Sequence, residues 1–152
     1  MNVVRKMVEL GVRVGEDGRF YVGDLEVSDT ALARSVGVDR RVVRGTAHQI
    51  QRDLRLRTVL TRVKPSGASL VDVASQLGYQ VIVVSADPHR PGVISGITSI
   101  LSKHGVVVRQ ALADDPDLTP EPRLTLVLQG RIPPEALVKC RSVPSVTSLT
   151  IR

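Results

Sequence analysis

Residues 80–104 constrain the fold of this chain most strongly, because they predict a buried strand, a sharp corner and an amphipathic helix in direct succession. The β-branched run from Val81 to Val84 suits a strand that is covered on both faces. Beyond the corner, apolar residues recur at helical spacing: Val93, Ile94, Ile97, Ile100 and Leu101. We therefore expect a sheet with a helix packed against it in the second half of the chain.

The corner at Pro91 and Gly92 is also a candidate binding site. Gly92 has no Cβ, so another group can approach the main chain closely there. The helix that follows offers unpaired N–H groups and the positive end of its dipole, an arrangement that suits a carboxylate. A plain structural turn explains the same residues, because such corners are common in α/β proteins.

The remainder of the second half alternates between strand and helix patterns. Further strands are predicted over 106–112, 124–128 and 146–151, with a helix starting at Pro133 and Pro134. The order predicts a ferredoxin-like βαββαβ fold with four antiparallel strands and both helices on one face. The other face is also apolar, so we expect a helix over 69–77 or a second copy of the chain to cover it, and we predict a homodimer.

Positive charge is concentrated in the first part of the chain. The whole chain carries +6, and residues 1–64 contribute 13 Lys and Arg against 8 Asp and Glu, whereas residues 65–152 contribute 8 against 7. This asymmetry indicates a polyanionic partner for the first part, since a basic field raises encounter rates with nucleic acids. A solvated basic face with no partner is the alternative.

Two helices separated by a short turn are predicted within this basic part. Ser28 or Asp29 caps the first helix, Gly37 breaks it, and Asp39 caps a second helix that continues to about Arg52. A turn of three or four residues containing Gly is the spacing of a helix-turn-helix. The overall fold class is therefore α+β, with an N-terminal helix-turn-helix domain and a C-terminal ferredoxin-like domain.

The second helix has two distinct faces. Val43, Ala47 and Ile50 form its buried stripe, and polar side chains form its outer face: Arg40, Arg41, Arg44, His48, Gln49 and Arg52. Such residues read base edges and hold phosphates in the major groove, so we expect duplex DNA as a partner. With one Phe and two Tyr, the chain has too few aromatic residues for a platform that stacks single strands. A helical hairpin used for protein contacts is the alternative.

Three domains or segments follow from these patterns: a DNA-binding domain over 1–64, a connecting helix within 65–79, and a ligand-binding and dimerisation domain over 80–152. The first domain includes a helix over 2–10 and a small β-hairpin around the turn at 15–18. Residues 52–64 fit either an extension of the second helix or a separate crossing segment.

No residue pattern indicates catalysis, a cofactor or a metal. Cys140 is the only cysteine, which excludes an intrachain disulfide and a cysteine metal cluster and makes the cytoplasm the expected location. His48, His89 and His104 fall in different elements without metal spacing, and the acidic, proline-rich segment 114–122 fits a solvated loop. We expect a protein that is not an enzyme.

Residues 80–152 resemble an ACT domain, the small-molecule sensing module of amino-acid metabolism. The resemblance is carried by the loop His89-Arg90-Pro91-Gly92-Val93, by the helix exit over 103–106 and by the order of elements. Together with the helix-turn-helix region, including residues 38–43, the whole chain resembles the archaeal predicted regulators of amino-acid metabolism that contain an ACT domain.

This resemblance implies an amino acid bound at an interface between ACT domains, with the backbone around Gly92 holding its carboxylate and Asp87 available for its ammonium group. The implied ligand-binding residues are Asp87, His89, Arg90, Pro91, Gly92, Val93 and Ile94. His89 replaces the usual loop Asp and Val107 replaces an Asn of the following strand, so a dimerisation scaffold without ligand is the alternative.

The leading functional hypothesis is a transcriptional regulator that binds duplex DNA and senses an amino acid. The alternative is a regulatory subunit that docks on a biosynthetic enzyme and confers feedback control. The segment 34–64 separates the two, because it carries 9 basic against 2 acidic residues, a charge that enzyme docking does not require.

Overall fold

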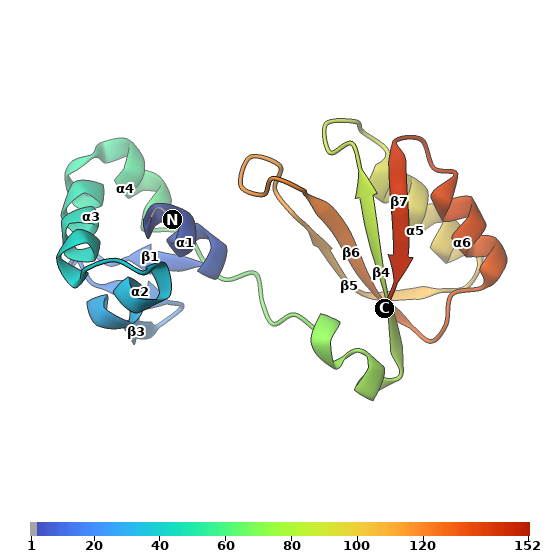
Figure 1. The fold of residues 1–152 in the computed structure, drawn as a ribbon, viewed down its shortest axis with the longest axis horizontal. Helices are drawn as coiled ribbons and strands as arrows, with labels where there is room; N and C mark the ends of the chain where they lie inside the picture. The colour runs from blue at the N-terminus through green and yellow to red at the C-terminus, as the bar shows by residue number, and fades with distance from the viewer. Residues whose placement is uncertain (1–2) are drawn as a thin grey trace. The chain divides into compact units, whose positions relative to one another are not determined.

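The computed structural model describes residues 3–152 and divides the chain into two compact units, unit 1 (Met1–Gly67) and unit 2 (Ala68–Arg152). Each unit combines helices with a small antiparallel sheet (Figure 1), so the expected α+β class is confirmed. The boundary between the units falls inside the segment 65–79 that was expected to be a connecting helix.

Unit 1 packs its helices and a three-stranded sheet around one apolar core. Its elements are α1 (Val3–Leu10), β1 (Val12–Val14), β2 (Phe20–Val22), β3 (Leu25–Val27), α2 (Asp29–Val36), α3 (Arg40–Arg52) and α4 (Leu54–Leu60). Met7, Phe20, Leu32 and Ile50 are fully buried in this core. The helix predicted over 2–10 is α1, and its expected first residue, Asn2, lies outside the described residues.

The predicted β-hairpin is formed by β1 and β2, which pair antiparallel. The sequence did not predict β3, which pairs antiparallel with β2 to give the order β1-β2-β3. β3 has only three residues, and Leu25 is 72% exposed, so its sequence shows no buried alternation. Local pairing with β2 across the short turn at Gly23 and Asp24 creates this strand.

The two helices of the basic region begin and end where the sequence predicts. The Ser28 hydroxyl accepts a hydrogen bond from the Ala31 N–H at 3.2 Å, and the Asp39 carboxylate accepts one from the Arg41 N–H at 2.7 Å. Gly37 ends α2 with a left-handed φ of 76°, a conformation that favours glycine.

The segment 52–64 forms a separate helix, α4, rather than an extension of α3. Asp53 adopts an extended backbone (ψ 114°), and its carboxylate accepts hydrogen bonds from the N–H groups of Arg55 at 2.8 Å and Leu56 at 3.1 Å. The same residue therefore ends one helix and caps the next.

Unit 2 is a four-stranded antiparallel sheet with two helices. Its elements are β4 (Tyr79–Ala86), α5 (Val93–Lys103), β5 (Val107–Ala113), β6 (Arg123–Gln129), α6 (Pro134–Arg141) and β7 (Val146–Ile151). The strands lie in the order β5-β6-β4-β7, and both helices cover one face of the sheet (Figure 1). Ile82, Ile97, Leu126 and Cys140 belong to the core between helices and sheet.

The opposite face of this sheet is covered by the start of unit 2. Val81, Val83 and Val127 are buried there against Ala74, with Leu70 and Val71 packed alongside. The order of elements from β4 to β7 is the expected strand, helix, strand, strand, helix, strand.

The predicted α-helix over 69–77 is wrong, because this segment forms two short 3-10 turns, Val71–Val73 and Ser75–Leu77. Gln110 of β5 explains the difference. Its side-chain amide donates to the Ala68 carbonyl at 2.7 Å and accepts from the Leu70 N–H at 2.8 Å. These bonds hold the backbone against the sheet edge, and Leu77 is left 50% exposed.

Candidate functional site

The corner between β4 and α5 is built as the sequence predicts. Gly92 adopts a left-handed φ of 102° immediately before α5, and a Cβ there would have strained backbone geometry although the space around it is open. No side chain caps the N-terminus of α5. Its first N–H groups are therefore directed toward whatever occupies the corner.

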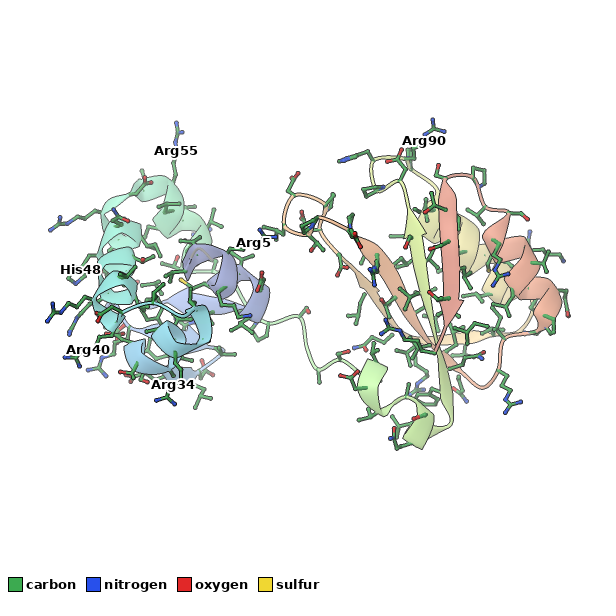
Figure 2. All side chains as sticks on the ribbon, in the orientation of Figure 1. Arg5, Arg34, Arg40, His48, Arg55 and Arg90 are labelled. Atoms are coloured by element: carbon green, nitrogen blue, oxygen red, sulfur yellow. The ribbon has the colours of Figure 1, made fainter. Side chains whose placement is uncertain are left out.

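The preceding loop is organised by Asp87. Its carboxylate accepts a hydrogen bond from the His89 N–H at 3.1 Å, and its second oxygen lies 3.7 Å from Nε of Arg90. Asp87 and Arg90 are both about half exposed or more, so each is free to turn toward a ligand. Arg90 lies at the loop end of β4 (Figure 2).

A pocket of about 660 Å³ opens at this corner, and we call it the corner pocket. It is lined by six of the seven predicted ligand residues: Asp87, Arg90, Pro91, Gly92, Val93 and Ile94. His89 is an exposed residue outside this lining, and so is Val107. Ile94 is 52% exposed and lines the pocket.

The far wall of the corner pocket comes from the connection between β5 and β6, which the sequence did not associate with a site. Asp114, Pro116, Pro122 and Arg123 line it. The Asp114 carboxylate accepts from the Arg123 N–H at 3.1 Å and so closes the neck of this connection. The Asp and Pro content of this segment was the available signal, but only the pairing of β5 with β6 brings it to the corner.

The chemistry of the corner pocket is mixed. Two acidic and two basic residues line it, Asp87, Asp114, Arg90 and Arg123. Aliphatic residues form much of the remaining lining: Val84, Ala86, Val93, Ile94, Ala113 and Leu124. A small molecule with one positive group, one negative group and an apolar side chain matches this lining.

The second candidate site is the outer face of α3. Val43, Ala47 and Ile50 are buried, and all six residues predicted to face outward are exposed: Arg40, Arg41, Arg44, His48, Gln49 and Arg52. Figure 2 shows Arg40 and His48 directed away from the body of unit 1. We call these six residues the α3 face.

Within the part of the chain that the structure describes, no acidic side chain neutralises the guanidinium groups of the α3 face. In residues 3–152, no ion pair involves Arg40, Arg41, Arg44 or Arg52. The acidic residues that flank α3 along the chain, Asp39 and Asp53, use their carboxylates to cap α3 and α4. Such a face attracts phosphates, and planar guanidinium groups hold them with paired hydrogen bonds.

Within the described chain, no cluster of three or more His, Cys, Asp or Glu side chains is placed to hold a metal ion. Cys140 is fully buried in the core of unit 2, and this burial raises the pKa of its thiol. The His104 ring lies 2.8 Å from the Ile100 carbonyl oxygen of α5. Over residues 3–152, no helix has the length and apolar character needed to span a bilayer.

No protein-family model and no curated protein sequence matches the chain. Similar solved structures include the C-terminal domain of the MgtC protein from Mycobacterium tuberculosis, at 18% identity and a TM-score of 0.36 over 49% of this chain and 83% of that one. A second similar structure is that of PH0061, at 15% identity and a TM-score of 0.29 over 99% of this chain and 89% of that one.

A third is a transcriptional regulatory protein of the AsnC family from Pyrococcus furiosus, at 15% identity and a TM-score of 0.26 over 83% of this chain and 77% of that one. Likenesses at these scores carry no argument about activity. The chain is a mixed α+β protein of two units with two chemically different candidate surfaces, and its function is argued from those surfaces.

Proposed function

We propose that the protein is a transcriptional regulator that binds duplex DNA through unit 1 and an amino acid through unit 2. In this proposal α2 and α3 form a helix-turn-helix, with α3 in the major groove, and unit 2 is a ferredoxin-like module of the ACT type. The single observation that supports it most is the α3 face, whose arginines have no acidic partner in the described chain.

DNA binding is tested by titrating a fluorescent duplex with the full chain at several salt concentrations. A protein that neutralises several phosphates loses affinity linearly on a log–log plot, with a slope of about −0.9 per phosphate contacted. A flat salt response rejects the phosphate contacts. Capture of a biosynthetic enzyme by the same full chain, without DNA affinity, supports the alternative of an enzyme-docking regulatory subunit.

The corner pocket is the proposed effector site. The free N–H groups at the start of α5, with Arg90, hold the ligand carboxylate, while Asp87 receives its ammonium group. Because much of the lining is aliphatic, we expect an amino acid with an apolar side chain. A thermal-shift screen of the full chain against the twenty amino acids tests this, since a ligand that binds only the folded state raises the melting temperature.

Dimerisation through unit 2 completes the proposal. The edge strands β5 and β7 each have one side without a strand partner in the described sheet, and Val107 and Ile151 are exposed there. A two-fold dimer places two α3 helices against half-sites about 34 Å apart. Effector binding changes DNA affinity only to the extent that the effector prefers one arrangement of that dimer. Sedimentation analysis measures the oligomeric state.

The proposal assigns no catalytic role. A nucleophilic cysteine must be accessible and ionised, whereas Cys140 is buried with a raised pKa. No histidine is paired with it in the contacts of residues 3–152.

A further inference from the structure

A second pocket lies in unit 1, beside the first two turns of α3. It encloses about 400 Å³ and is lined by four arginines, Arg19, Arg40, Arg41 and Arg44, together with the hydroxyl residues Ser28 and Thr30. Three elements contribute to it: the sheet, the N-terminus of α2 and the start of α3. We call it the arginine pocket.

The charge balance in the arginine pocket is positive after its acidic residues are counted. Glu26 and Asp29 also line it, so four guanidinium groups face two carboxylates. Glu26 is occupied by Arg19, whose NH1 lies 3.0 Å from its carboxylate. This contact also raises the pKa of Arg19. The three arginines of α3 are left without an ion-pair partner in residues 3–152.

The geometry of these arginines favours one compact anion over an extended one. Arg40 and Arg44 are four residues apart, which places them on the same face of α3, one turn above the other. Arg41 borders the same hollow. Several arginines around one hollow supply the paired, charge-assisted hydrogen bonds that suit the tetrahedral oxygens of a phosphate group.

We infer that the arginine pocket binds a phosphate group, held by Arg40, Arg41 and Arg44. This inference deepens the proposed function, on which its second half rests: if the phosphate belongs to the DNA backbone, base reading passes to His48, Gln49 and Arg52, which lie outside the pocket. That division departs from the usual docking of a recognition helix, in which N-terminal residues contact base edges.

The phosphate has two possible sources, the DNA backbone or a free phosphorylated molecule. The first experiment therefore uses inorganic phosphate alone, titrated into isotope-labelled full chain while NMR follows arginine side chains and the backbone amides of 28–30. We expect saturable shifts at the arginine pocket. The double variant Arg41→Gln with Arg44→Gln lacks two of the guanidinium groups that bind the phosphate, so its phosphate affinity should be about tenfold lower or more.

The matched control is Arg34→Gln with Arg55→Gln, which removes two exposed arginines of unit 1 that lie outside both the pocket and the α3 face. We expect it to leave phosphate affinity unchanged. If both double variants lose phosphate affinity equally, or if phosphate binding does not saturate, the proposal that the arginine pocket binds phosphate is wrong. Glu26→Gln is a gain-of-function test: it removes a carboxylate and frees Arg19, so phosphate should bind about two- to fivefold more tightly.

A second experiment measures duplex DNA affinity of the same variants against two unrelated sequences. If the phosphate is a backbone phosphate, Arg41→Gln with Arg44→Gln weakens both duplexes equally and makes the salt slope shallower by about one or two. Gln49→Ala instead changes the ratio between the two duplexes. An unchanged DNA affinity in the pocket variant assigns the site to a free phosphorylated molecule and overturns the backbone source.

The two proposals fail separately in these measurements. If the chain binds phosphate in the pocket but binds no duplex at low salt, the proposed function is contradicted and the proposed phosphate site is supported. A chain that binds duplex with a steep salt slope but shows no phosphate response at 28–30 or at the α3 arginines contradicts the pocket and retains the function.

Discussion

The two units contain charged surfaces of opposite design. On the α3 face, arginines stand without acidic partners in the described chain, whereas at the corner pocket carboxylates and guanidinium groups alternate, as in the 3.7 Å contact between Asp87 and Arg90. The first arrangement favours a polyanion, because its charges add. The second favours a small zwitterion, because each end of such a molecule finds an opposite charge.

The cores of the two units are separate clusters, and the largest expected effect tests their independence. Ile50→Ala in unit 1 and Ile97→Ala in unit 2 each empty a fully buried position. We expect each to lower the unfolding free energy of its own unit by about 2–5 kcal/mol. Calorimetry of the full chain should show one transition move in each variant; equal movement of both transitions would contradict separate cores.

The next largest effect tests the difference in charge design. Arg40→Gln, Arg44→Gln and Arg52→Gln together should weaken duplex DNA binding about a hundredfold at low salt, because three charge-assisted phosphate or base contacts are lost. The matched variant carries Arg90→Gln, Arg109→Gln and Arg123→Gln in unit 2, which removes the same net charge. Fluorescence anisotropy should show near wild-type DNA affinity for it, and an equal loss would show that only total charge matters.

A smaller effect separates the corner pocket from backbone strain. Gly92→Ala and Gly105→Ala place a Cβ at the two ends of α5, where both glycines have positive φ and open space around them. Each should cost about 1 kcal/mol of stability. Only Gly92→Ala should also abolish stabilisation by the amino acid found in the thermal-shift screen. Loss of this stabilisation in both variants would contradict ligand binding at the corner pocket.

The smallest effect concerns the exposed pair Asp17 and Tyr21. The Tyr21 hydroxyl donates to the Asp17 carboxylate at 2.7 Å, which lowers the pKa of Asp17 and raises the pKa of Tyr21. The lowered pKa of the Asp17 carboxyl stabilises the folded state at pH values above its unfolded pKa near 3.8. This stabilisation is lost as pH falls through the folded pKa. The raised Tyr21 pKa contributes stability below its unfolded value near 10.0, lost as pH rises through the folded pKa.

Tyr21→Phe should therefore lower the melting temperature slightly at pH 7, and this difference should disappear as pH falls through the lowered pKa of Asp17 and its carboxylate becomes protonated. Tyr79→Phe in unit 2 is the matched control. The contact of Tyr79 is the guanidinium of Arg109, 5.5 Å above its ring, which phenylalanine keeps. A melting difference for Tyr21→Phe that persists unchanged after the Asp17 carboxylate has been protonated by acid would contradict the role of the carboxylate.

Local chemistry explains which parts of the fold the sequence could predict. The caps Ser28 and Asp39 and the turn at Gly37 act within a few residues of the chain, and the structure places all three as predicted. The buried run Val81 to Val84 likewise needs no distant partner to be recognised as a strand.

Distant contacts explain what the sequence could not predict. The segment 69–77 has a helical pattern but forms 3-10 turns, and its start is held against β5 by Gln110, about forty residues away, which donates to Ala68 and accepts from Leu70. The corner pocket was half predicted for the same reason. Its near wall follows from Gly92 and the start of α5, whereas Asp114 and Arg123 reach it only through strand pairing.

The Gln110 bonds to Ala68 and Leu70 have a mechanical consequence. Gln110 lies on β5, and the last residue of this strand, Ala113, borders the corner pocket. The Gln110 side chain is hydrogen-bonded to the first residues of unit 2. The same strand therefore borders the corner pocket at one end and holds the first residues of unit 2 further back. We expect that any shift of β5 caused by a molecule in the corner pocket would also displace Ala68 and Leu70.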